Sequence, residues 1–481
     1  MQITSPVESS QLNVVGEASV SWGKVRGIVL LSLTFLLSIA SASVKVAEAD
    51  SQRPNFIVIL CDNLGYGDVG CFGSQAHRTP NIDQLAASGL KLTNFYSTSG
   101  VCTPARASLQ TGRYPRRVGL HETDIDGAVL RPVSHNGLSS NEITIAEVLK
   151  QRGYATTLIG KWHLGDQPQF LPTRQGYDEY FGLPYSDDMV GDKRPGWPPL
   201  PLMEGEDVIE APVDRNLLTK RYTERVIQFI ETHQQQPFFV LLSHAMPGST
   251  PQPFASEEFR GKSLNGAWGD SVEEIDWSTG QIVNKLEQLG IDDETLIVWT
   301  SDNGAPRFRT PAGSNAPFAT WGYSATEGGQ RVPCVVHWPT KVPAGSVSDV
   351  LCSMMDILPT CARLANTSLP SNHIIDGYDL SEVLLGRKNS SPYDAFYYYL
   401  RGDLQAVRGP QWKLQLTNGQ LFDMRSDPLE QVDVSAEHPE IVAALQDFAA
   451  RARDELGDGE QIGTGQGTAG YEASPLPRLL R

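Results

Sequence analysis

The feature that most constrains the fold of this chain is a repeated order of helical pattern and apolar strand. A continuous apolar run at residues 56–60 is followed by polar residues and glycines. Three later segments place a helical pattern before an apolar strand: TIAEVLKQRGYATTLIG, RYTERVIQFIETHQQQPFFVLL and SVEEIDWSTGQIVNKLEQLGIDDETLIVWTS. Continuous apolar runs are typical of strands buried on both faces. The order therefore predicts an α/β fold, a doubly wound and mostly parallel sheet sandwiched by helices.

The pattern changes after about residue 390. The segments DAFYYYL, LQAVRGPQWKLQL and GQLFDM predict short antiparallel strands, and a helix is expected over about 439–456. We therefore expect an α/β domain over residues 51–390 and a small C-terminal subdomain of antiparallel sheet plus helix over 391–456. Residues 457–481 are rich in glycine, serine and proline, and this composition predicts a disordered tail.

The N-terminal region has the pattern of an export signal. Lys24 and Arg26 precede a short apolar segment that ends in small residues at 40–42. A charged flank, an apolar stretch and a small-residue cleavage site are typical of a secretory signal peptide, and the stretch is short for a membrane-spanning helix. We predict a signal peptide over residues 1–42, no stable membrane span after its cleavage, and a periplasmic or secreted protein. An uncleaved anchor is the alternative.

Charge and cysteine content exclude several classes of function. The formal net charge of −17 argues against nucleic acid as a partner, and it requires any anion site to be locally basic. The six cysteines show no spacing typical of a zinc site. In an exported protein Cys352 and Cys361 could form a disulfide, but the sequence does not fix the pairing.

Polar residues follow each of the four expected strands. Carboxyl ends of parallel strands meet at one edge of a sheet, so we expect these side chains to lie close together. They are Asp62, Asn63, Lys161, His163, His244, Asp302 and Asn303. The two Asp–Asn pairs offer the oxygen ligands that a hard divalent cation needs, although Asp and Asn also stabilise turns without any ion.

The segment CTPARASLQTGR, residues 102–113, is one of several motifs that occur in a characteristic order. The others are GKWHLG, LPTRQGYDEYFGLPYSDDM, VEEIDW and TSDNGA. On these motifs, from about residue 54 to 456, the chain resembles a type I sulfatase of the alkaline-phosphatase-like superfamily, and more narrowly its arylsulfatase A branch. The resemblance implies a sulfuric ester hydrolase.

The resemblance implies a chemical role for Cys102. A formylglycine-generating or other sulfatase-maturing enzyme would convert it to formylglycine (3-oxoalanine). A hydrated aldehyde carries two hydroxyls, of which one attacks sulfur and the other then releases the sulfate. A buried structural thiol is the alternative.

The resemblance also implies the surroundings of this group. The metal ligands would be Asp62, Asn63, Asp302, Asn303 and the oxygen derived from Cys102, holding calcium or sometimes magnesium. Asn63 replaces the second aspartate of the usual pair, which removes one negative charge. Arg106 would stabilise the hydrate and the metal, Lys161 would hold sulfate, His163 would assist release of the bound sulfate, and Ser186 would contact it.

The chain departs from the family pattern at two positions. Many relatives have a second histidine after the strand that contains His244, and this chain has Gly248 there. We therefore expect His244 to serve as the acid, with a structural histidine as the alternative. Many relatives also have a lysine shortly before EGG, where this chain has Trp321 or Gly322.

These observations favour a calcium-dependent sulfatase that hydrolyses the sulfate ester of a small molecule or glycan, an aryl or carbohydrate sulfate. One alternative is a phosphoester hydrolase of the same superfamily. The other is a degenerate protein that binds sulfated glycans without hydrolysing them, which the two missing basic residues would favour.

Overall fold

A computed structural model describes residues 53–308 and 312–480, and residues from Arg53 onward form one compact unit. The predicted signal peptide lies outside the described residues. Within the described part, no helix combines the length and apolarity needed to cross a membrane. All six cysteines are free thiols, including Cys352 and Cys361.

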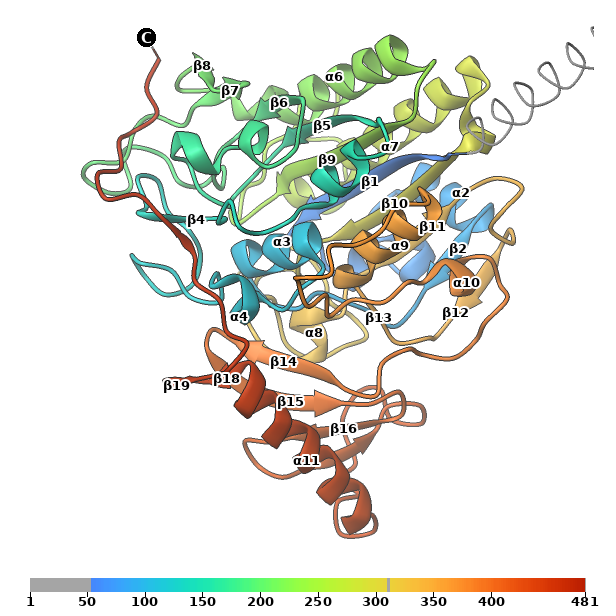
Figure 1. Ribbon diagram of the computed structural model, residues 1–481. Coiled ribbons are helices and arrows are strands. Elements are labelled where there is room, and N and C mark those ends of the chain that lie inside the picture. The colour runs from blue at the N-terminus through green and yellow to red at the C-terminus, as the bar shows by residue number, and fades with distance from the viewer. Residues whose placement is uncertain (1–52, 309–311, 481) are drawn as a thin grey trace, which may run out of the picture. The chain divides into compact units, whose positions relative to one another are not determined.

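A ten-stranded mixed sheet forms the centre of this unit (Figure 1). Its strands, in order across the sheet, are β12 (Ser346–Ser348), β2 (Leu90–Leu92), β11 (Cys334–His337), β10 (Thr295–Ser301), β1 (Asn55–Asp62), β9 (Phe238–Pro247), β5 (Ala155–Gly160), β6 (Glu179–Gly182), β7 (Leu202–Glu204) and β8 (Asp207–Glu210). The five strands from β10 to β6 pair in parallel, whereas β11, β7 and β8 pair antiparallel with their neighbours. The mostly parallel sheet predicted from the apolar runs is therefore confirmed at its centre.

Helices cover both faces of this sheet (Figure 1). Apolar side chains of α3 (Cys102–Thr111), α5 (Ile145–Lys150) and α9 (Ile357–Leu364) share a core with Phe56, Val58 and Leu60 of β1. Side chains of α2 (Pro80–Ala87), α6 (Leu218–His233) and α7 (Gly266–Leu289) share a second core with Ile57 and Ile59. Successive residues of a strand face opposite sides. The same alternation turns Asp62, at the end of β1, toward α3.

The C-terminal subdomain is also as predicted. Strands β14 (Phe396–Leu400), β15 (Asp403–Arg408), β16 (Trp412–Gln415) and β17 (Leu421–Asp423) form an antiparallel sheet. Helix α11 (Pro439–Glu455) packs against it through a shared apolar core. Shorter elements of the chain are β3 (Phe95–Tyr96), α4 (Pro115–Val118), β4 (Asn136–Gly137), α8 (Glu327–Gln330), β13 (Cys352–Ser353) and α10 (Ser381–Leu384).

The segment after α11 differs from the prediction. Its composition predicted disorder, whereas the structure gives residues 457–480 defined partners. Strands β18 (Gly457–Asp458) and β19 (Gln461–Ile462) pair with each other, and β20 (Gly470–Tyr471) pairs with β4. The buried Arg116 donates hydrogen bonds to the carbonyls of residues 456, 459 and 461. A distant arginine thus satisfies backbone acceptors that local composition does not reveal.

Candidate active site

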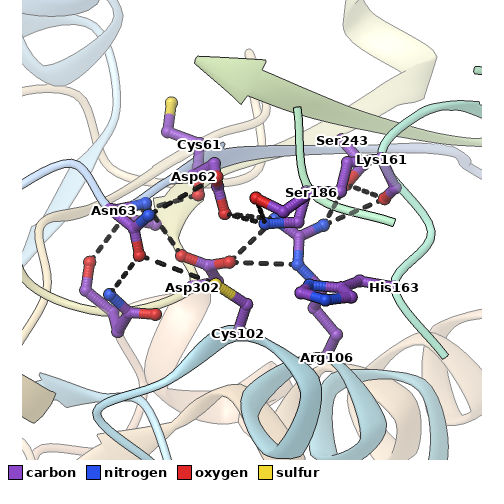
Figure 2. A network of polar contacts seen from close by, with 12 residues as sticks. Cys61, Asp62, Asn63, Cys102, Arg106, Lys161, His163, Ser186, Ser243 and Asp302 are labelled. Atoms are coloured by element: carbon purple, nitrogen blue, oxygen red, sulfur yellow. Dashed lines mark hydrogen bonds and ion pairs between the residues drawn. The ribbon is translucent and has the colours of Figure 1, made fainter. Parts of the chain in front are cut away.

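The candidate site lies at the carboxyl ends of the central strands, against the first turn of α3 (Figure 2). In the parallel pair of β1 and β10, Cys61 is opposite Ser301, which brings the following Asp62 and Asp302 together. Cys61 points away from this cluster, whereas Asp62 points into it (Figure 2). The strand-end residues predicted to meet therefore do so for both Asp–Asn pairs and for Lys161.

Two buried cations neutralise the two buried aspartates. Arg106 donates to Asp302 Oδ2 from Nε at 3.0 Å and from Nη2 at 2.7 Å, and Nη2 also donates to Asp62 Oδ1 at 3.1 Å. Lys161 Nζ lies 2.7 Å from Asp62 Oδ1. Burial works against ionisation of Asp62, but Lys161 and Arg106 outweigh it and hold its pKa below the usual value. Burial and the neighbouring Asp62 raise the pKa of Asp302.

Cys102 begins α3 and faces this cluster. It is 4% exposed, and its Sγ lies 3.7 Å from Asn63 Oδ1. Burial, then the negative charge of Asp62, raises the pKa of its thiol well above the usual value. An unmodified Cys102 would therefore be a neutral thiol and a weak nucleophile, because the thiolate is the reactive form.

The donor set around Cys102 fits a hard divalent cation. Ligand atoms of Asp62, Cys102 and Asp302 all lie within 4.8 Å of one another. The Oδ1 of Asn63 faces the same space, and the buried Oδ1 of Asn303 has no hydrogen-bond partner among the described residues. Carboxylate and amide oxygens are the ligands that calcium and magnesium prefer. Unsatisfied buried oxygens are costly unless something binds them, so the residues present fit such an ion.

Lys161, Ser186 and His163 form a second side of the site. Lys161 Nζ lies 3.2 Å from Ser186 Oγ. His163 is buried, and its Nε2 lies 2.9 Å from the carbonyl of Leu130, while Nδ1 has no partner among the described residues. Burial, then Lys161 and Arg106, lowers the pKa of His163 well below its usual value. A neutral ring that donates from Nε2 leaves the lone pair of Nδ1 free to accept a proton.

The structure does not bring His244 into this cluster. Its ring is fully buried, and neither nitrogen has a hydrogen-bond partner within the described residues. Burial lowers the pKa of His244 to about 3. The preceding Ser243 contacts the site instead, donating to the carbonyl of Lys161 and accepting from Arg106 Nη1. Successive side chains of β9 face opposite sides of the sheet, so Ser243 and His244 cannot both face the site. This alternation was the sequence signal that could have indicated Ser243.

A cavity of about 390 Å³ opens above Cys102. Its lining includes the predicted residues His163 and Ser186, together with residues that sequence reasoning missed: Arg131, Asp188, Ser249, Tyr323 and Arg401. These residues come from loops and from the C-terminal subdomain, where no strand pattern indicates which side chains will meet. Ser249 directly follows Gly248, and Tyr323 directly follows Gly322.

Comparisons with known proteins agree with this geometry. A family model described as Sulfatase matches residues 54–367. N-acetylgalactosamine-6-sulfatase of Mus musculus is 38% identical over 397 residues, covering 79% of this chain and 75% of that protein. Arylsulfatase A of Homo sapiens is 39% identical over 370 residues, covering 73% and 71%. The solved structure of Ps i-CgsB in complex with k-i-k-neocarrahexaose aligns with a TM-score of 0.73 and 31% identity, covering 83% of this chain and 92% of that one.

Proposed function

The chain belongs to the sulfatase family of sulfuric ester hydrolases, and on that basis we propose that it hydrolyses sulfate esters with a formylglycine formed from Cys102 and a bound calcium or magnesium ion. The observation that carries this proposal is the place of Cys102. Its side chain is buried at the start of α3, and its Sγ shares one small space with ligand oxygens of Asp62 and Asp302.

The charged and amide side chains of the cluster have distinct roles in this proposal. Asp62, Asn63, Asp302 and Asn303 would hold the metal ion, which would draw charge from the sulfate oxygens. Formylglycine at position 102 would supply the hydrated aldehyde that serves as nucleophile. Arg106 keeps the aspartates ionised and oriented through its paired hydrogen bonds, and Lys161 offers a buried cation for the sulfate.

Two polar residues complete this set. Ser186 lies beside Lys161 Nζ and lines the cavity, so its hydroxyl is in place to bind a sulfate oxygen. His163 lines the same cavity, and its Nδ1 has no hydrogen-bond partner in the described part of the chain. A neutral imidazole with a free lone pair can take the proton that must leave the nucleophile's hydroxyl group.

We further propose a carbohydrate sulfate as the substrate and a location outside the cytoplasm. Two relatives support the substrate class, since one is named for a sulfated amino sugar and another was solved with neocarrahexaose. The charged side chains of Arg131, Asp188 and Arg401 in the cavity lining could bind the hydroxyl groups of a sugar, beside apolar residues such as Met189 and Leu400. The predicted signal peptide supports the location.

Mass spectrometry of the peptide that spans Cys102, purified from the native source, tests the nucleophile. We expect the formylglycine form, and an unmodified cysteine would overturn the proposal. A modified sample is then assayed with an aryl sulfate and a matched aryl phosphate, each with calcium and with chelator. Faster sulfate release that chelator abolishes is expected. Faster phosphate release would identify a phosphoester hydrolase, and tight binding of sulfated glycan without release would identify a binding protein.

A further inference from the structure

Packing excludes a larger side chain at Gly248 and Gly322, two of the positions at which the chain departs from the family pattern. Gly248 has a φ of +80°, and a Cβ there would lie 2.8 Å from Oδ1 of the buried Asp187. A Cβ on Gly322 would lie 2.2 Å from the carbonyl oxygen of Gly304. The Cβ on Gly248 would also lie 2.9 Å from the carbonyl oxygen of Ala245. Contacts this short with backbone atoms require the chain to move, so neither glycine position can present a cationic side chain toward Cys102 in this fold.

The residues that follow these glycines occupy the opening of the cavity. Ser249 Oγ lies 2.9 Å from the hydroxyl of Tyr323, and both residues line the cavity above Cys102. Tyr323 is 44% exposed and has a φ of +69°. A tyrosine held in the left-handed region costs free energy, and such strain is concentrated at functional sites.

A third residue, Asn63, determines which hydroxyl of the Ser249–Tyr323 pair donates the hydrogen bond. Asn63 Nδ2, which can only donate, lies 2.9 Å from Ser249 Oγ. Ser249 accepts that hydrogen bond and can donate its own proton to Tyr323 Oη. The hydroxyl proton of Tyr323 then remains for a group in the cavity. An aspartate at position 63 would accept a hydrogen bond from Ser249, which could then no longer donate to Tyr323. The asparagine that replaces the family's second aspartate therefore fixes Ser249 as the donor to Tyr323.

The difference in exposure between the buried cations and Tyr323 indicates that Tyr323 would meet the ester oxygen of the substrate. Arg106 and Lys161 are buried, at 3% and 1% exposed, and Lys161 Nζ contacts Ser186 Oγ of the cavity lining, whereas Tyr323 of the same lining is 44% exposed. A sulfate group drawn to the buried cations leaves its ester oxygen, and the alcohol attached to it, toward the opening. We propose that the Tyr323 hydroxyl, aligned by Ser249 and Asn63, donates a hydrogen bond to the ester oxygen of the substrate.

This inference rests on the proposed function and adds the residue that assists the leaving group. When the bond between sulfur and the ester oxygen breaks, the sulfuryl group passes to the nucleophile and the electron pair stays on the oxygen. A hydrogen bond from Tyr323 stabilises that charge until a proton from solvent neutralises it. The effect is largest for alcohols that hold the charge poorly, a class that includes sugars.

A series of aryl sulfates with increasingly basic phenols, from 4-nitrophenyl to 4-methoxyphenyl sulfate, tests this step. We expect Y323F to lose on the order of 10- to 100-fold in kcat/KM for the poorest leaving group and less than about threefold for the best. S249A should show the same trend with a smaller loss. The control is Y471F, which alters a tyrosine that is 67% exposed and is not part of the cavity lining. An equal loss across the series, or no loss, would overturn the inference.

A binding measurement separates failure of this inference from failure of the proposed function. In the C102A background, which lacks the nucleophile, calorimetry with phenyl sulfate should give a Kd that Y323F weakens about three- to tenfold. Y471F should leave that Kd unchanged. An unchanged Kd in Y323F would contradict the contact, even for a protein that hydrolyses nothing. Thermal midpoints within about 2 °C of the parent confirm that the variants are folded.

Discussion

Arg106 holds Asp302 through two nitrogens, with Nε at 3.0 Å and Nη2 at 2.7 Å from the same carboxylate oxygen. Both side chains are buried, and Nη2 also reaches Asp62. The planar guanidinium therefore fixes the spacing of two proposed metal ligands, which a lysine's single ammonium group could not do.

The variant Arg106→Lys should accordingly keep the positive charge at this position but lose most of the sulfatase activity. We expect kcat for an aryl sulfate to fall at least 100-fold, because the transition state loses preorganised charge. The control is Arg78→Lys, which alters an exposed arginine paired with Glu273. If Arg106→Lys retained more than a tenth of the parent kcat, the guanidinium geometry would not be required.

Metal binding should stabilise the folded protein through the two Asp–Asn pairs. A cation that binds only the folded state raises the thermal midpoint as its concentration rises. We expect calcium to raise the midpoint of the parent protein. Asn303→Ala removes a buried oxygen that has no hydrogen-bond partner among the described residues, and we expect it to need at least tenfold more calcium for the same rise. The exposed Asn418→Ala is the control. Equal calcium responses in all three proteins would exclude Asn303 as a ligand.

His244 should affect the pH dependence of stability more than it affects catalysis. Its folded pKa of about 3 lies below the unfolded value of 6.5, so the unfolded chain binds the extra proton as pH falls below 6.5. The free energy of unfolding then decreases by up to about 1.4 kcal/mol per pH unit from this one group, down to about pH 3.

Denaturant unfolding between pH 7 and 4.5 measures this effect. We expect His244→Gln to show a shallower decrease than the parent over this range. Its kcat at pH 7.5 should stay within about threefold of the parent value, because the ring makes no hydrogen bond to any described residue of the site. A tenfold loss of kcat would instead return His244 to the catalytic set that the sequence predicted.

The C-terminal subdomain should depend on Glu327 for its attachment. Glu327 is buried in α8, shortly after Tyr323 in the chain, and its Oε1 lies 2.9 Å from Nζ of the buried Lys413 in β16. Lys413 also pairs with Glu430 at 2.9 Å, but the buried Arg408 lies 3.5 Å from Glu327 Oε2 and would lose that partner. Removing one partner of a buried ion pair typically costs about 3–5 kcal/mol, because the other charge stays buried. Glu327→Ala should lower the free energy of unfolding by about that amount in a urea titration. Glu382→Ala, in an exposed pair with Arg387, should change it by less than about 1 kcal/mol.

Much of the fold and the buried part of the site followed from patterns that are local in the sequence. The apolar runs predicted the strands of the sheet centre, and the polar residues after them predicted that Asp62, Asn63, Lys161 and Asp302 would meet. These predictions succeed because parallel strands bring their carboxyl ends to one edge regardless of the loops between them.

The predictions that differ from the structure concern features set by the direction of a side chain or by contacts between distant parts of the chain. His244 was expected in the site, but Ser243 faces α3, since a shift of one residue along a strand reverses the side on which a side chain lies. The tail after residue 456 looked disordered by composition, yet Arg116 binds its backbone carbonyls. Loop residues such as Ser249 carry no periodic signal, so the sequence did not indicate that they would line the cavity.

By itself, the sequence determined the α/β sheet, the family and the buried end of the site, because these depend on the order of strands and on motifs with fixed spacing. Only the tertiary structure decided what replaces the two missing basic residues. Gly248 and Gly322 are closed off by Asp187 and by the backbone of Gly304, and the adjacent Ser249 and Tyr323 meet across the cavity. The physical reason is that two loops distant in the chain touch only after the sheet has set their positions.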